Sequence, residues 1–315
     1  MNTILGVTVP FFALILFGYV AARRRWVPPE AVPAFNGFLL YFAVPAMLFR
    51  FASGTPFEQL SDIRYFIAWG AAGVSVVFVV AFAAHRLFHV AMRDAAFLGL
   101  VGAVSNAGYL GVPLLVALLG ARAAAPTILV VVADLLIVAS VGLALAESQG
   151  ATRRGWHDDV KEAIVRLAFN PFVIAMALGA IFSGAKLTLR TPFAEIVKLL
   201  ADAAGPCALF AIGVSLVRPD APIKSPILAL PVAAKLILHP ALVALAMLLI
   251  GADDFTFRAA LLAAALPSAG WVFIFALRYE ADAGRVSAVI LLTTALAFVT
   301  FSALVWLLGV GRAGG

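Results

Sequence analysis

SNAGYLGVP, at residues 105–113, interrupts an apolar run that is otherwise long enough to cross a membrane as one helix. The run covers 95–119, and its centre holds an asparagine, two glycines and a proline. Glycine and proline disfavour a continuous helix, and proline also removes a backbone donor. A second stretch of this kind, LPSAGW at 266–271, lies in the middle of the run 256–278. The two stretches therefore predict two helices that break at the depth of a bilayer.

The composition of the chain indicates that a membrane is its solvent. Of the 315 residues, 64% are hydrophobic and only 12% are charged, whereas soluble domains are about 45–50% apolar and about 25% charged. A soluble protein of this size still needs a polar surface, so we expect an all-α membrane protein with several spans. The ten expected spans are 3–22, 33–51, 64–88, 95–119, 123–146, 167–184, 192–217, 223–250, 256–278 and 284–309.

An internal repeat relates the first five expected spans to the last five. The matches, each 161 residues apart, are Pro10-Phe11 with Pro171-Phe172, Gly18 with Gly179, and Pro45-Ala46-Met47-Leu48-Phe49 with Pro206-Cys207-Ala208-Leu209-Phe210. Chance among abundant residues would explain a single glycine match, but it explains the constant offset poorly. An odd number of spans in each copy makes the second copy enter from the opposite face, as in many secondary transporters. We therefore expect two inverted five-helix repeats at 1–147 and 166–315, joined by a cytoplasmic linker loop at 148–165.

The distribution of Lys and Arg predicts the orientation. Thirteen of the 22 basic residues lie in the loops after the first, third, fifth, seventh and ninth spans, against seven on the other side. Because cytoplasmic loops carry an excess of basic residues, we expect both termini outside, in a multi-pass protein of the cytoplasmic (inner) membrane.

The two breaks are the candidate binding site. A break at membrane depth exposes backbone polar groups that lipid cannot satisfy, so protein, water or a ligand must supply partners. The half-helix after each break directs its partly positive N-terminus inward, which favours an anion such as a carboxylate. A simple proline kink in a packed helix is the alternative for either break alone. The candidate residues are Ser105, Asn106, Gly108, Tyr109, Pro113, Pro267, Ser268 and Gly270.

Three titratable residues inside the spans are candidates for coupling to H+ or Na+. Asp134, Lys235 and His239 lie near the middle of their spans, where a charged side chain costs roughly 2.5–3.5 kcal/mol on insertion scales. A buried pair of Asp134 with Lys235 is one arrangement left open, and His239 has the alternative of a backbone hydrogen bond. Lys198 and Asp202 are four residues apart, and we expect them to form a pair on one helix.

Other classes of protein find little support in the sequence. The four histidines never form the H-E-x-x-H motif of a metalloprotease, and no G-x-x-x-x-G-K phosphate loop is present. The basic residues form short clusters rather than a stripe, so we expect no nucleic-acid partner. We expect no enzyme activity, no metal site and no cofactor. A membrane channel or receptor that binds an organic anion without coupled transport remains the alternative to a carrier.

Six segments together resemble the auxin efflux carrier family. They are Phe17-Gly18-Tyr19, Tyr41-Phe42-Ala43-Val44-Pro45, 106–113 (NAGYLGVP), Asn170-Pro171, 235–240 (KLILHP) and Leu266-Pro267-Ser268-Ala269. The resemblance covers nearly the whole chain and is carried by the order and spacing of these segments.

This resemblance implies a fold similar to the bile-acid sodium symporters, in which the fourth and ninth helices cross at their breaks. The first, second, sixth and seventh helices would form a scaffold that often dimerises, with helix breaks at Pro45 and Pro206. The other six would move in an elevator-like cycle. Family substrates are organic anions, including malonate and other carboxylates proposed for bacterial members. The short linker departs from the plant carriers and disfavours auxin as the substrate.

Overall fold

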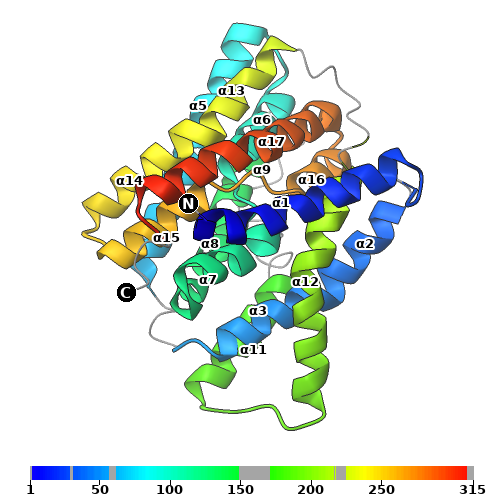
Figure 1. The fold of residues 1–315 in the computed structure, drawn as a ribbon. Helices are drawn as coiled ribbons and strands as arrows, with labels where there is room; N and C mark the ends of the chain where they lie inside the picture. The colour runs from blue at the N-terminus through cyan, green and yellow to red at the C-terminus, as the bar shows by residue number, and fades with distance from the viewer. Residues whose placement is uncertain are drawn as a thin grey trace.

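The computed structural model describes residues 2–28, 31–56, 62–148, 171–215, 217 and 225–310, and all regular secondary structure in these ranges is helical (Figure 1). In the first half the helices are α1 (Asn2–Arg23), α2 (Val32–Phe38), η2 (Leu39–Ala43), α3 (Val44–Ser53), α5 (Ile63–Phe88), α6 (Met92–Ala103), η3 (Ala107–Gly111), α7 (Val112–Leu119), η4 (Ala121–Ala123), α8 (Ala124–Ala133), η5 (Asp134–Val138) and α9 (Ala139–Glu147). In the second half they are α11 (Pro171–Gly184), α12 (Phe193–Ser215), η6 (Pro226–Leu228), α13 (Ala229–Ala233), η7 (Ala234–Leu238), α14 (His239–Leu249), α15 (Asp254–Ala264), α16 (Trp271–Arg278) and α17 (Ala283–Leu307).

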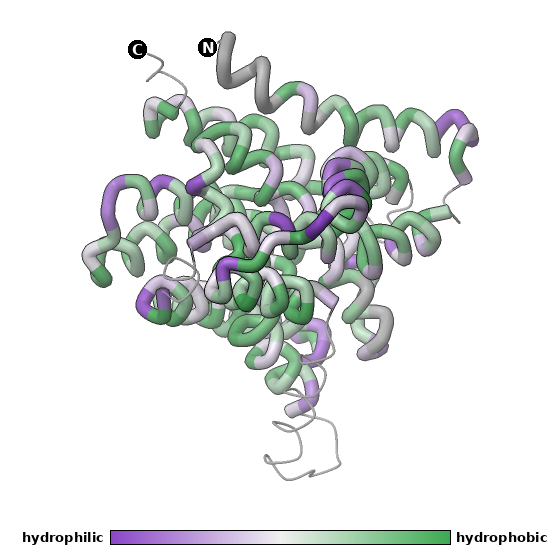
Figure 2. The backbone as a smooth tube through the Cα atoms, turned by 90° about the horizontal axis from the view of Figure 1, so that it is seen from below, coloured by the Kyte–Doolittle hydropathy of each residue, from purple (hydrophilic) through white to green (hydrophobic). Residues whose placement is uncertain are grey.

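Six helical runs in the described residues are long and apolar enough to cross a membrane. They are Val32–Ser53, Ile63–Phe88, Ala121–Glu147, Phe193–Val214, Pro226–Leu249 and Ala283–Leu307. Figure 2 shows apolar residues along the helices and many of the hydrophilic ones at turns. Many large apolar side chains on these helices are exposed, among them Phe42, Leu199 and Ile237. An outward apolar surface of this extent fits lipid as the solvent, and the chain is a multi-pass membrane protein.

Two prolines that we expected to break helices do not do so. The run from Val32 to Ser53 passes Pro45 without a gap, because the π-helical turn η2 directly precedes the proline. Helix α12 continues through Pro206 over its full length. A proline removes one N–H from the helix, and a widened turn or a bend accommodates that loss without ending the helix. The linker expected at 148–165 lies, apart from Ser148, outside the described residues.

The first group of helices, α1, α2, α3, α11 and α12, packs through close backbone contacts. Helix α1 lies along α12, α11 lies along α3, and α3 also contacts α12. Figure 1 shows α2, α3, α11 and α12 together on one side of the molecule, with α5, α13, α14 and α15 on the other.

Glycines lie at two of these close contacts. A Cβ atom on Gly18 would overlap the Phe210 carbonyl oxygen, and one on Gly179 would lie 2.8 Å from the Phe49 carbonyl oxygen. Small residues let helices in lipid approach closely enough for tight packing. Gly18 and Gly179 are 161 residues apart, and so are Phe49 and Phe210, so the two contacts are equivalent under the offset found in the sequence.

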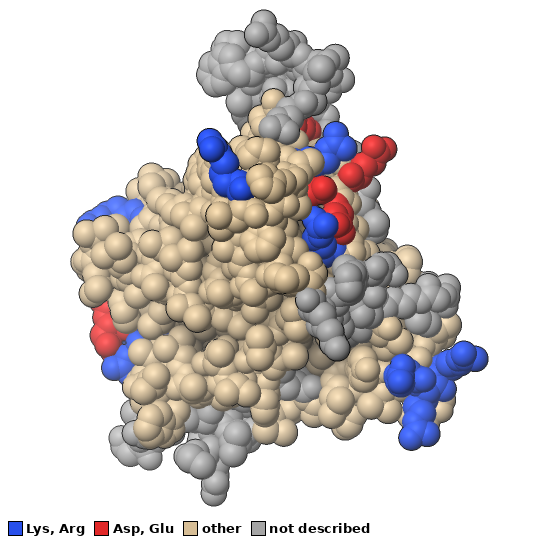
Figure 3. Space-filling model, turned by 90° about the horizontal axis from the view of Figure 1, so that it is seen from above, with Lys and Arg blue, Asp and Glu red and all other residues tan. Residues whose placement is uncertain are grey.

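The second group, which contains helices α5 to α9 and α13 to α17, surrounds the polar residues of the protein interior. Helix α5 packs on α6, α8 and α14, and α15 contacts both α8 and α14. Charged side chains on the face shown in Figure 3 form small separate groups around a wide neutral surface. The titratable side chains buried between these helices, Asp134, Lys235 and His239, are separate from these surface charges.

Candidate functional site

The two breaks lie against each other, as the family resemblance implied. Helix α6 ends at Ala103, and the backbone becomes extended at Val104, whose N–H still donates to the Leu100 carbonyl. The N–H groups of Ser105 and Asn106 find their acceptors outside this helix. Ser105 forms an antiparallel β-bridge with Ser268. The Asn106 N–H donates to the Pro267 carbonyl at 2.9 Å, and the Ala269 N–H donates to the Val104 carbonyl at 3.2 Å. Each break therefore supplies the backbone partners that lipid cannot supply to the other.

New helical segments begin directly after the crossing. The π-helical turn η3 starts at Ala107 and leads into α7, and α16 starts at Trp271. First-turn N–H groups have no partner within their own helix, and the helix dipole adds partial positive charge there. A cavity of about 20 Å³ lies beside both starts and is lined by Ser105, Asn106, Gly108, Tyr109, Val131, Asp134, Leu135, Ala269 and Trp271. This volume holds about one water molecule, so a dicarboxylate enters only if the lining residues move apart.

The Asp134 carboxylate is buried and lies directly behind the first break. It begins the π-helical turn η5, and only 2% of the residue is exposed. Its Oδ1 accepts a hydrogen bond from Trp69 Nε1 at 2.8 Å, and its Oδ2 accepts one from the Ser105 backbone N–H at 3.1 Å. Single π-helical turns inside α-helices are frequent at functional sites.

The Lys235 ammonium is fully buried and bonded in three directions. Its Nζ donates to Ser105 Oγ at 2.7 Å and to the Ala264 carbonyl at 3.0 Å. His239 Nδ1 lies 3.0 Å from Nζ, where a neutral imidazole accepts the third N–H. Lys235 thus connects the first break to the end of α15, the helix before the second break.

Asp134 and Lys235 do not form a direct ion pair within the described part of the chain. The ion pairs there are Arg50–Asp202, Glu195–Lys198, Asp254–Arg258 and Asp282–Arg285. Ser105 joins Asp134 and Lys235 instead, because its N–H bonds the carboxylate and its hydroxyl bonds the ammonium. The expected same-helix pair of Lys198 with Asp202 is wrong, since Asp202 bonds Arg50 of α3 at 2.6 Å.

The second break has a neutral set of partners. Ser268 Oγ donates to the Val101 carbonyl at 2.6 Å, and the Ser268 N–H lies 3.3 Å from Thr293 Oγ1. The two hydroxyl oxygens of Ser268 and Thr293 are 3.1 Å apart.

Three candidate residues, Pro113, Pro267 and Gly270, contribute no side chain to the polar contacts described above. Pro113 stands at the start of α7 and lies beside Gly205 of α12 rather than among the residues that line the small cavity. Pro267 contributes through its carbonyl, and a Cβ on Gly270 would meet open space. Trp69 and Thr293 were not predicted as site residues. Trp69 gave no signal because a tryptophan is ordinary in an apolar span, and Thr293 resembled the hydroxyl residues that join helices in membranes.

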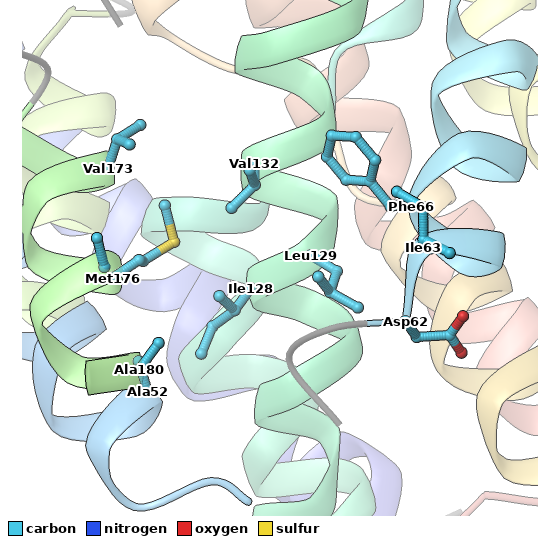
Figure 4. Close-up of a pocket in the computed structure, with 11 residues that line it drawn as sticks. Ala52, Asp62, Ile63, Phe66, Ile128, Leu129, Val132, Val173, Met176 and Ala180 are labelled. Atoms are coloured by element: carbon cyan, nitrogen blue, oxygen red, sulfur yellow. The ribbon is translucent and has the colours of Figure 1, made fainter. Parts of the chain in front are cut away.

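A larger cavity of about 310 Å³ lies away from these polar groups (Figure 4). Its lining comes from α3, α5, α8 and α11 and is almost entirely apolar, including Phe66, Ile128 and Met176. Figure 4 shows the Asp62 carboxylate at the rim, directed away from the other lining residues. This cavity lies at a seam between the two helix groups, and its lining offers few hydrogen-bond donors to an anion.

No group of three or more His, Cys, Asp or Glu side chains that could hold a metal ion occurs among the described residues.

The chain as a whole is similar to known membrane transport proteins. A family model described as membrane transport protein matches residues 3–307. A protein of Rhizobium meliloti named "Putative malonate transporter" is 36% identical over 320 residues, covering 99% of this chain and 98% of that protein. A protein of Escherichia coli named "Uncharacterized transporter YfdV" is 26% identical over 284 residues, covering 88% of each chain.

Proposed function

The chain belongs to the membrane transport protein family, that of the auxin efflux carriers, and from this membership we propose that it is a permease for a small carboxylate. It is a membrane transporter and not an enzyme. The substrate class is the proposal, and malonate is the first candidate because the Rhizobium meliloti relative carries that name.

The observation that carries the proposal is the pairing of two broken helices beside one cavity. Asn106 offers an amide, and the helical segments that start at Ala107 and Trp271 direct the partly positive ends of their dipoles toward the cavity. Such helix starts favour negative charge. Paired discontinuous helices near the bilayer centre are typical of the substrate sites of secondary transporters.

We further propose the ten-span architecture with two inverted repeats. Two observations support it: the glycine contacts of Gly18 and Gly179 are related by the offset of 161 residues, and the break of the first half pairs with that of the second through the bridge of Ser105 with Ser268. In this architecture the scaffold is the group α1, α2, α3, α11 and α12, and the second group carries the site past it. The nearly apolar seam of Figure 4 suits such sliding, because it has few polar contacts to break. The orientation with both termini outside and a homodimer built on the scaffold belong to the same proposal.

Coupling to a proton follows from the position of Asp134 in this proposal. The carboxylate lines the same small cavity as Asn106, so a bound anion and an ionised Asp134 would repel each other. Uptake of a proton by Asp134 removes that repulsion, so anion and proton bind together. We favour H+ over Na+ because Lys235 already bonds Ser105 Oγ and the Ala264 carbonyl, so these two oxygens are less available to a sodium ion.

Counterflow in proteoliposomes tests the function. Vesicles loaded with unlabelled malonate should take up labelled malonate with saturation, whereas a channel or a receptor would show no such exchange. Asn106→Ala should reduce this uptake at least several-fold without loss of folded protein. Asn36→Ala, in α2 of the first group, is the matched control and should leave it unchanged. Equal uptake by the two variants would remove Asn106 from the site.

A further inference from the structure

Each break is held by the next long helical run in the chain, Ala121–Glu147 for the first break and Ala283–Leu307 for the second. The Ser105 N–H donates to Asp134 Oδ2 at 3.1 Å, and the Ser268 N–H lies 3.3 Å from Thr293 Oγ1. Asp134 is 29 residues after Ser105, and Thr293 is 25 residues after Ser268. Asp134 and Thr293 therefore have the same structural role, since each lies within hydrogen-bond reach of the N–H of the serine at its break, although one is a carboxylate and the other a hydroxyl.

Both contacts are buried away from bulk water. Ser105 and Ser268 are 3% and 1% exposed, and Thr293 is completely buried. A buried backbone N–H without an acceptor costs about 1–3 kcal/mol, and the extended backbone of a break provides no helical acceptor. Each side chain thus fixes the position of a backbone segment whose neighbours line the small cavity.

The two halves differ in what they can do with a proton. Thr293 Oγ1 lies 2.8 Å from the Val289 carbonyl and 3.1 Å from the Ile290 carbonyl, so its single proton has acceptors within its own helix. Its oxygen is left to accept from the Ser268 N–H, and no group in this set changes charge. At the first break, by contrast, Asp134 is titratable, and Lys235 brings a positive charge to the Ser105 hydroxyl.

We propose that Thr293 is the positioning residue of the second break, a neutral counterpart of Asp134 that sets substrate affinity without taking part in coupling. The inference rests on the proposed transport function and deepens it, because it assigns proton coupling to Asp134 and only the positioning of a break to Thr293. Both breaks determine the affinity for the substrate. Only the first break, with its titratable Asp134, makes substrate uptake depend on the proton gradient.

Replacement of Thr293 by valine tests the proposal, since valine keeps the shape and removes the acceptor. Malonate uptake by Thr293→Val should show a KM raised about 3- to 10-fold, the size of one lost neutral hydrogen bond. Its maximal rate and its pH dependence should stay those of the unaltered protein. Thr293→Ser, which retains the hydroxyl, should restore the KM. Thr294→Val removes a neighbouring buried threonine hydroxyl and serves as the control, with an unchanged KM.

Asp134→Asn should differ from Thr293→Val in its pH dependence. Because the variant lacks the titratable carboxylate, its malonate uptake should no longer vary with pH. A Thr293→Val variant that flattens this dependence as well would overturn the division of tasks. A KM equal to that of Thr294→Val would overturn the positioning role.

Hydrogen exchange provides a second readout that needs no substrate. Thr293→Val should speed exchange in the peptide 266–271 at least several-fold relative to Thr294→Val and leave 104–111 unchanged. Unchanged exchange in 266–271 would refute the contact that positions the second break. Absence of malonate counterflow in the unaltered protein, together with the expected exchange result, would refute the proposed substrate and leave Thr293 as the residue that holds this break.

Discussion

Replacing Lys235 with methionine removes the cation that connects the two breaks while keeping most of the apolar stem. The ammonium donates to Ser105 Oγ and the Ala264 carbonyl, and its third N–H faces His239 Nδ1. Hydrogen bonds to a charged group contribute about 1.5–3 kcal/mol each, so the three together contribute roughly 4–9 kcal/mol. Removing the ammonium also removes the several kcal/mol needed to bury it. The expected net destabilisation is about 3–5 kcal/mol, the usual result of removing one partner from a buried charged network.

Thermal unfolding of the purified protein in detergent measures this effect. A change of 1 kcal/mol shifts the midpoint by about 2–4 °C in chains of 150–250 residues and by less in longer ones. We therefore expect the Lys235→Met midpoint to fall by roughly 5–10 °C. Lys198→Met is the matched control, because Lys198 is exposed and 3.9 Å from Glu195, and such surface pairs contribute about 0–1 kcal/mol.

A double variant separates the charge from the packing. In Lys235→Met the buried Asp134 loses its nearby positive charge, and Asp134→Asn removes the carboxylate that this leaves behind. Residues in one hydrogen-bond network couple by about 0.5–3 kcal/mol, so the double variant should be less destabilised than the sum of the single ones. A Lys235→Met midpoint within about 1 °C of the unaltered protein, or strict additivity, would refute this account of the network.

Three further predictions concern other parts of the molecule. Gly213→Ala should lower the thermal midpoint by several degrees, because its Cβ would overlap the α1 backbone at a cost of about 1–3 kcal/mol, while Gly37→Ala, where the Cβ meets open space, should not. Asp253→Ala should cost about 1 kcal/mol at pH 7, because it removes the N-cap of α15. The hydroxyl of Thr256 holds the pKa of Asp253 below its ordinary value, so the difference between Asp253→Ala and the unaltered protein should persist above pH 3.8 and vanish as the pH falls through that lowered pKa. Ala180→Phe should fill the apolar seam and slow counterflow while leaving substrate affinity unchanged; equal rates would count against sliding at this seam.

The sequence revealed the parts of the site that have a local chemical signal. Glycine and proline near Ser105 and Ser268 predicted the breaks, because their effect on a helix does not depend on distant residues. Asp134 and Lys235 were found because a charge within a span is costly wherever it points.

Features that depend on contacts between distant residues were missed or misjudged. The partner of Asp202 is Arg50 of another helix, which spacing along one helix could not reveal. Trp69 bonds Asp134 through one nitrogen of an otherwise apolar ring, so hydropathy gave no sign of it. Pro206 lies within a continuous helix, since one missing N–H does not end a helix whose other groups remain bonded.

The crossing itself is made by main-chain atoms, since the Asn106 N–H meets the Pro267 carbonyl and the Ala269 N–H meets the Val104 carbonyl. Hydrogen bonds of this kind are available to almost any residue, so the architecture places few demands on the side chains that project from it. Mutations at those positions can retune which solute is accepted while the frame persists. A main-chain crossing of this kind can therefore persist while the side chains beside it change.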